Sequence, residues 1–275
     1  MRSPARQRLP GNAGFSLVEL AVVLVVVALM LSSLLYTLSA QIDQRDFEDT
    51  RRRLEQAREL VLAFAIVNGR LPCPARANSA GAEVRNAAGE CKDAANVEDY
   101  YGGTPGGVVG GLLPAVTIGY PTVDAAGFAL DAWQSAPQNR IRYAVAKTIT
   151  NCSGTSTLPH FENATNLKGN GISCQPNDLL ICKSATGISG INCGGSANQI
   201  MSQSLVAAII FSTGKNATTT GGTGADELAN LNGDQIFVFH PPAPSGAANG
   251  EFDDQFTWIT VGELYGKLIA AGVLP

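Results

Sequence analysis

The sequence predicts an α+β fold in which a long N-terminal helix packs on an antiparallel β-sheet head that carries disulfides. Three observations predict it. An apolar run near the N-terminus continues into an amphipathic helical pattern, short β-branched runs follow later in the chain, and all six cysteines lie beyond the apolar run. A chain of 275 residues is long enough to bury a core in one or two domains.

Composition excludes two classes of function. The chain has 19 Lys+Arg and 23 Asp+Glu, so its net charge is −4, and a chain of this sign repels phosphate backbones. We therefore expect no nucleic-acid partner. The two histidines, His160 and His240, are accompanied by no hydrolase or metalloprotease motif. We therefore expect no enzymatic activity.

The N-terminal apolar segment predicts a transmembrane helix. Residues 15–40 would make about 39 Å of helix at 1.5 Å per residue, against roughly 30 Å for a bilayer core. No charged residue lies between Glu19 and Asp43. The arginines before the segment predict that its N-terminus stays in the cytoplasm and that the rest of the chain is extracytoplasmic.

The helical pattern continues beyond the apolar segment. Residues 41–68 keep an apolar stripe at the spacing of one helix face, made of Phe47, Leu54, Ala57, Val61 and Phe64. Gly69 then occupies the position of a helix C′ residue. One helix should therefore run from about residue 16 to residue 68. A cleaved secretory signal is the alternative, but Leu38 stands where its cleavage site needs a small residue.

Residues 14–20, Gly-Phe-Ser-Leu-Val-Glu-Leu, carry a resemblance to a known family. With the basic leader before them and the apolar run after them, they resemble the type IV prepilin motif of type IV pilins and type II secretion pseudopilins. The resemblance implies a pilin-like roll in which the long helix, first transmembrane and then amphipathic, packs on the sheet. It also implies a single-pass protein of the bacterial inner membrane that later enters a filament.

The same resemblance implies residue roles and partners. Prepilin peptidase would cut after Gly14 and methylate the new N-terminus at Phe15, and Glu19 would act in filament assembly. The expected partners are other pilins or pseudopilins, the peptidase and an inner-membrane assembly platform. The chain would then consist of a leader (1–14), the long helix (15–68) and an extracytoplasmic head (69–275).

The cysteines predict disulfides in the head. None of them has the CxxC spacing of zinc knuckles, and an even number in the exported part of a chain is typical of disulfide bonds. Because short local loops are favoured, we prefer one of the fifteen connectivities. Its pairs are Cys73–Cys91, Cys152–Cys174 and Cys182–Cys193.

The head should contain strands at residues 140–146, 205–211, 236–239 and 257–261, each a short run rich in apolar and β-branched residues. A capping box at Thr260 and Glu263 predicts a helix directly after the last strand. Residues 150–200 have the composition of loops, and disulfides are expected to replace a core there.

An acidic segment of the head indicates a calcium site. Oxygen-bearing side chains with a glycine turn suit Ca²⁺, and the resemblance also implies calcium near the end of the sheet. The candidate ligands are Asp226, Glu227, Asn230, Asn232 and Asp234. The alternative is a solvated turn in which these side chains bind only each other and water.

These observations favour a structural subunit, a minor pilin or pseudopilin of a type IV pilus or type II secretion filament. Two alternatives remain open. The head could be an adhesin or binding module displayed on a pilin stalk, or the chain could be a membrane-anchored periplasmic protein that never polymerises.

Overall fold

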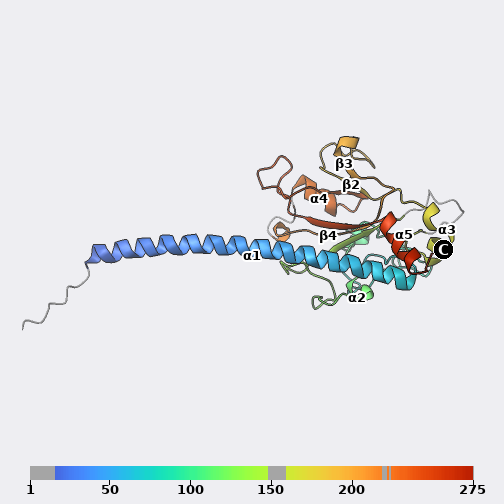
Figure 1. The fold of residues 1–275 in the computed structure, drawn as a ribbon, viewed down its shortest axis with the longest axis horizontal. Helices are drawn as coiled ribbons and strands as arrows, with labels where there is room; N and C mark the ends of the chain where they lie inside the picture. The colour runs from blue at the N-terminus through green and yellow to red at the C-terminus, as the bar shows by residue number, and fades with distance from the viewer. Residues whose placement is uncertain (1–15, 148–158, 219–221, 223, 275) are drawn as a thin grey trace, which may run out of the picture. The chain divides into compact units, whose positions relative to one another are not determined.

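The structure is a computed structural model that describes residues 16–147, 159–218, 222 and 224–274, without the side chains of residues 33–38. The chain divides into two compact units, residues 1–45 and 46–275. The fold is α+β, and helix α1, Leu17–Asn68, crosses the boundary between the units (Figure 1).

Local hydrogen bonds account for both ends of α1. At its start the Ser16 backbone N–H donates to Glu19 Oε2 at 2.8 Å, and the Glu19 N–H donates to Ser16 Oγ at 3.2 Å. This reciprocal pair is a capping box. At its end Gly69 adopts a φ of +67° and its N–H donates to the Ala65 carbonyl at 2.8 Å. The helix therefore ends at Asn68, where the sequence predicts it to end.

In the second unit, α1 contributes one face to the main core. Leu54, Ala57 and Val61 of the predicted stripe are buried, while Phe47 and Phe64 at its ends are half-buried. Helical spacing therefore predicted correctly which face of this segment packs.

The first sheet has the strand order β1-β4-β6, formed by Arg142–Val145, Val206–Ser212 and Gln255–Thr260. Both pairings are antiparallel, with Tyr143 opposite Ile210 and Ile210 opposite Thr257. Every residue of the central strand β4 is buried, as expected for a strand covered on both faces.

The second sheet corrects the predicted fold. Its strand order is β3-β2-β5, formed by Gln199–Met201, Leu180–Cys182 and Ile236–Val238, and β2 pairs with β5 in parallel. The prediction of a pilin-like roll, a long helix packed on an antiparallel sheet, is therefore wrong. Strands β2 and β3 lie in the segment that was predicted to consist of loops. They were not predicted because strands of three residues are too short to show alternation.

The membrane prediction is also corrected. Among the described residues, no helix combines the length and the apolar character needed to cross a bilayer. The unbroken apolar run, residues 20–31, accounts for about 18 Å of helix, well below a hydrocarbon core of roughly 30 Å. Polar residues Ser32, Ser39 and Gln41 follow it. The predictions of a transmembrane first half of α1 and of a single-pass inner-membrane localisation are therefore wrong.

Short helices complete the second unit. The α-helices after α1 are α2 (Ala115–Ile118), α3 (Ala164–Asn170), α4 (Ala225–Leu231) and α5 (Val261–Ala270). Single 3₁₀ turns are η1 (Pro105–Gly107), η2 (Gly171–Ser173), η3 (Ser196–Asn198) and η4 (Asn216–Thr218). Helix α5 follows β6 directly, at the position that the sequence predicts.

The N-cap of α5 gives a testable stability effect. The Thr260 hydroxyl accepts the Glu263 N–H at 3.2 Å. Thr260→Ala should lower the free energy of unfolding by about 1 kcal/mol, because the N–H then loses its capping partner. Urea denaturation measures the change. Thr260→Ser is the matched control and should retain most of the stability, whereas equal losses in both variants would contradict a capping role.

Candidate functional site

The second unit contains two of the disulfide bonds that the sequence predicts. Cys73 bonds Cys91 and Cys182 bonds Cys193, which are two of the three pairs preferred from the sequence. Cys174 is disulfide-bonded, while Cys152, its predicted partner, lies outside the described residues. None of the described cysteines is free.

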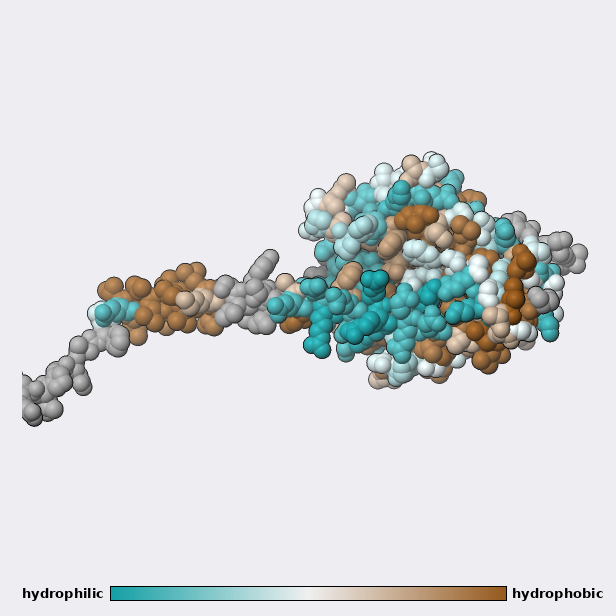
Figure 2. Space-filling view, in the orientation of Figure 1, coloured by the Kyte–Doolittle hydropathy of each residue, from teal (hydrophilic) through white to brown (hydrophobic). Residues whose placement is uncertain are grey.

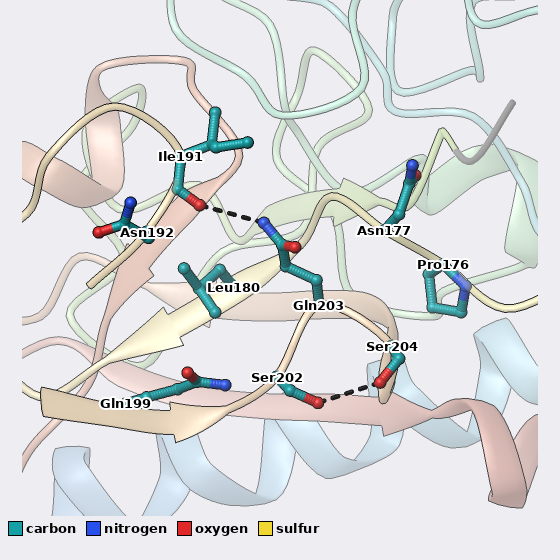
Figure 3. Close-up of a pocket in the computed structure, with 9 residues that line it drawn as sticks. All are labelled: Pro176, Asn177, Leu180, Ile191, Asn192, Gln199, Ser202, Gln203 and Ser204. Atoms are coloured by element: carbon teal, nitrogen blue, oxygen red, sulfur yellow. Dashed lines mark hydrogen bonds between the residues drawn. The ribbon is translucent and has the colours of Figure 1, made fainter. Parts of the chain in front are cut away.

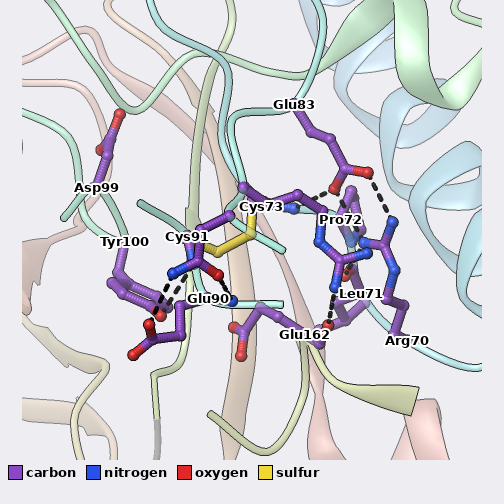
Figure 4. Close-up of a disulfide and its surroundings, with 12 residues drawn as sticks. Arg70, Leu71, Pro72, Cys73, Glu83, Glu90, Cys91, Asp99, Tyr100 and Glu162 are labelled. Atoms are coloured by element: carbon purple, nitrogen blue, oxygen red, sulfur yellow. Dashed lines mark hydrogen bonds and ion pairs between the residues drawn. A yellow bond between two sulfur atoms is a disulfide. The ribbon is translucent and has the colours of Figure 1, made fainter. Parts of the chain in front are cut away.

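The Cys73–Cys91 bond is embedded in a polar network (Figure 4). Glu83 accepts two hydrogen bonds from the Arg70 guanidinium, at 2.9 and 2.6 Å, and a third from the Cys73 N–H at 3.0 Å. On the other side the Cys91 N–H donates to the Tyr100 hydroxyl at 3.0 Å. Both cysteines are fully buried. This surrounding fits a structural role rather than a reactive thiol pair.

Glu19 lies in the first turn of α1, and its side chain is exposed. The hydrogen bond from the Ser16 N–H lowers the pKa of its carboxyl below the usual range. Gly14 and Phe15, the predicted cleavage and methylation positions, lie outside the described residues. Large apolar side chains cover this part of the helix and are exposed: Leu17, Val18, Leu20, Val22, Val23, Leu24, Val25, Val26, Val27, Leu29, Met30 and Leu31.

The structure does not bring the predicted calcium ligands together. The Asp226 carboxylate accepts hydrogen bonds from the Ala185 N–H at 2.5 Å and the Asn249 amide at 2.9 Å, and lies 3.1 Å from His240 Nε2. Those partners occupy the oxygens that a cation would need.

Two other predicted ligands form a turn of their own. The Asp234 N–H donates to Asn232 Oδ1 at 2.8 Å, and Asp234 Oδ1 accepts the Ile236 N–H at 2.8 Å. Asn230 is buried and donates to Asp254 Oδ2 at 2.7 Å. Asn232 and Asp234 are exposed, so this part of the segment matches the solvated-turn alternative.

Glu227 belongs to a different acidic cluster, with Asp253 and Asp254. One oxygen from each of the three carboxylates lies within 4.8 Å of the others. Asp253 and Asp254 were not predicted as ligands because Asp253 follows Glu227 by 26 residues and Asp254 comes next, just before β6. This trio could hold a metal ion.

Among the described residues, each carboxylate of the acidic cluster directs one oxygen to protein donors and leaves the other oxygen without a hydrogen-bond partner. Glu227 Oε1 accepts the Asn216 amide at 2.6 Å, Asp253 Oδ2 accepts the Asn216 N–H at 3.0 Å, and Asp254 Oδ2 accepts the Asn230 amide. Within the part of the chain that the structure describes, Glu227 Oε2, Asp253 Oδ1 and Asp254 Oδ1 are buried and have no hydrogen-bond partner. Buried carboxylate oxygens normally have a donor or a cation beside them.

Burial also makes the acidic cluster hard to ionise. It raises the pKa of Asp253 to about 6, and it raises the pKa of Asp254 well above and of Glu227 above their ordinary values. The neighbouring carboxylates raise each pKa further. A divalent cation would remove this penalty by supplying positive charge to the unpartnered oxygens.

A pocket on the second sheet has a neutral lining (Figure 3). It has a volume of about 430 Å³ and is lined by Pro176, Asn177, Leu180, Ile191, Asn192, Gln199, Ser202, Gln203 and Ser204. Within it, Gln203 Nε2 donates to the Ile191 carbonyl at 3.0 Å, and the Ser202 and Ser204 hydroxyls are 3.1 Å apart. No lining side chain is an acid, a base or a cysteine, so the lining holds no general base to activate the Ser202 or Ser204 hydroxyl.

The two histidines also lie in structural settings. His160 Nε2 is 2.9 Å from the Tyr265 hydroxyl, which donates to the Cys174 carbonyl at 2.6 Å. Burial lowers the pKa of His160 to about 4. His240 stacks on Phe252 at a ring-centroid distance of 4.0 Å.

Comparison with known proteins gives no relative for this chain. No protein-family model, curated protein sequence or solved structure matches it.

Proposed function

We propose that the chain is a structural subunit of a filament of the type IV pilus or type II secretion kind, assembled through the N-terminal part of α1. Prepilin peptidase would first cut between Gly14 and Phe15. The observation that carries the proposal is the exposed apolar surface of α1 between residues 17 and 31, together with the prepilin-like motif that precedes it.

The exposed surface needs a partner. The exposed fractions are 86% for Leu17 and 66% for Leu29, and Figure 2 shows hydrophobic residues along this stretch of helix. A contiguous apolar surface of this kind marks an interaction site, because leaving it in water is unfavourable. The same stretch of helix from other subunits offers a matching surface, so a helical bundle of subunits would cover it.

Glu19 supplies the one charge on this surface. Cleavage before Phe15 would create a positively charged α-amino group four residues away from it. When helices pack with an axial stagger, the amine of one subunit can pair with Glu19 of a neighbour. Buried polar pairs of this kind set the register of packed helices.

The capping box gives the proposal a sharp test. Glu19→Ala should lower co-purification of the chain with sheared filaments by about tenfold, which corresponds to losing roughly 1.4 kcal/mol of assembly free energy. Glu19→Gln keeps the capping geometry but not the charge, and it should fail equally. Ser16→Ala removes the cap but leaves the charge, and it should assemble normally.

The readout is the amount of each variant in filament preparations, with mass spectrometry of the mature N-terminus as the control for processing. N-methyl-Phe15 should be residue one in every variant. If Glu19→Gln assembles while Ser16→Ala fails, Glu19 acts only as a helix cap. Normal incorporation of Glu19→Ala would refute the assembly role.

A second proposal concerns calcium. We propose that the acidic cluster of Glu227, Asp253 and Asp254 binds Ca²⁺ and so fixes α4 to the chain before β6. The three unpartnered buried oxygens support it, since hard carboxylate oxygens are the ligands that calcium prefers. Saturating Ca²⁺ should therefore raise the melting temperature of the chain.

A further inference from the structure

A cavity beside β1 differs in character from the pocket with the neutral lining. It has a volume of about 580 Å³, within the range of small-molecule sites. Its lining is Ala77, Val109, Leu112, Ala136, Pro137, Gln138, Arg140 and Arg142. The walls are thus mostly apolar, and the charged groups are two arginines without an acid in the lining.

Arg140 is neutralised within the protein. Its Nε donates to Asp124 Oδ2 at 2.9 Å, and Nη2 lies 2.8 Å from the same oxygen. The guanidinium also lies over the Phe128 ring, 4.1 Å from the ring centroid. Arg140 is therefore a fixed part of the wall and has little free charge to offer a ligand.

Arg142 has no such partner. Within the described chain no carboxylate lies within 4 Å of its guanidinium, and its single hydrogen bond runs from Nη1 to the Gly110 carbonyl at a long 3.3 Å. Its Nε is buried and has no hydrogen-bond partner among the described residues, and the side chain lines the cavity. Burial lowers the pKa of Arg142 to about 10, so the side chain still carries its charge at neutral pH.

Two acids, Asp254 and Asp99, favour the charged form of Arg142 from a distance, and neither contacts its guanidinium. Asp99 accepts the Gly111 N–H and lies 3.5 Å from the buried Arg76 guanidinium. Asp254 has its pKa raised well above the ordinary value by burial. A half-buried cation with no carboxylate in contact is costly, and an anion placed in the cavity would lower that cost.

We propose that this cavity binds a small organic acid, with its carboxylate on the Arg142 guanidinium and its apolar body against Val109, Leu112 and Pro137. An arginine fork matches the two oxygens of a carboxylate. The exposed Gln138 amide can add a neutral donor at the rim. The site is independent of the proposed filament role, and none of the three carboxylates of the acidic cluster lines the cavity.

The test uses 4-phenylbutyrate as the probe and its neutral isostere 4-phenylbutyramide as the comparison, with the full chain at pH 7.5. Titration calorimetry should find the acid bound at least about tenfold more tightly than the amide, the ratio expected for one charge-assisted hydrogen-bonded pair. Arg142→Gln should abolish this preference. Arg85→Gln is the matched control, because Arg85 also forms no ion pair within the described residues but does not line the cavity.

Since both probes can adhere to the exposed apolar face of α1, the preference for the acid is the decisive quantity. A melting curve for each variant establishes that it is folded. Equal binding of acid and amide to the wild type would overturn the proposal, as would a preference that survives in Arg142→Gln. If Arg85→Gln lost the preference for the acid to the same extent, the proposal would also be overturned, because the preference would then reflect net charge alone. Should Arg142→Gln fail to fold, Val109→Trp, which narrows the cavity and leaves the charge, must weaken binding of the acid for the proposal to stand.

Discussion

Replacing both Cys73 and Cys91 by serine should lower the free energy of unfolding by about 3 kcal/mol or more. The bond closes a loop with a sequence separation of 18 residues, for which the chain-entropy model gives about 3 kcal/mol. The replacement also buries two hydroxyls where the sulfurs are fully buried, and hydroxyls without partners add to the loss.

Urea denaturation of the oxidised wild type and the double-serine variant measures this difference. The matched control is the Cys182→Ser, Cys193→Ser variant, whose bond has a sequence separation of 11 residues. Loop closure by this second bond contributes a similar amount, about 3 kcal/mol. If the Cys73 and Cys91 variant loses more free energy of unfolding than this control, the difference measures the packing of the Cys73–Cys91 bond beside Arg70 and Glu83. A loss below about 1 kcal/mol would show that the polar network alone holds this region.

Long periodic elements could be predicted from the sequence. The amphipathic stripe and Gly69 predicted where α1 packs and where it ends, because burial of one helix face and a left-handed C′ residue both leave a local pattern. Strand β4, Val206–Ser212, was found for the same reason, as a long buried run. The capping box at Thr260 likewise depends on residues three apart.

Features built from distant residues could not be predicted. Strands β2 and β3 have three residues each. Strand β2 pairs in parallel with β5, which lies more than fifty residues further along the chain. The acidic cluster has the same origin, since Glu227 meets Asp253 and Asp254 only after α4 and β6 are in place. Local spacing instead grouped Glu227 with Asp226 and Asp234, which bind other donors.

A local pattern can also have two meanings. Ser16 and Glu19 belong to the prepilin-like motif, and they also form the capping box of α1. The first meaning was predicted from the resemblance, and the second was not predicted, although the spacing of Ser16 and Glu19 is that of a capping box. The unpaired charge of Arg142 left no signal at all, because counter-ions are set by the tertiary structure.

Calcium should stabilise the chain more at pH 8 than at pH 5. Burial raises the pKa of Asp253 from 3.8 to about 6, so without metal the stability contributed by this group is fully present below about pH 4 and is lost as the pH rises through 6. A shift of this size corresponds to about 2 kcal/mol after discounting for partial exposure. Asp254 and Glu227 shift in the same direction.

Calcium and protons compete for the same oxygens, so the gain in melting temperature on adding Ca²⁺ should grow as the cluster loses its protons. Asp254→Asn removes one ionisable carboxyl group and one metal ligand. It should raise the melting temperature without metal at pH 8 and abolish most of the calcium response. Asp234→Asn, in the exposed turn, is the control and should respond like the wild type. The measurement is a set of thermal melts at both pH values, with Ca²⁺ or with chelator. A calcium shift that is equal at pH 5 and pH 8, or unchanged in Asp254→Asn, would place the cation away from this cluster. Neither result fits three carboxylates that must ionise before they can bind the cation.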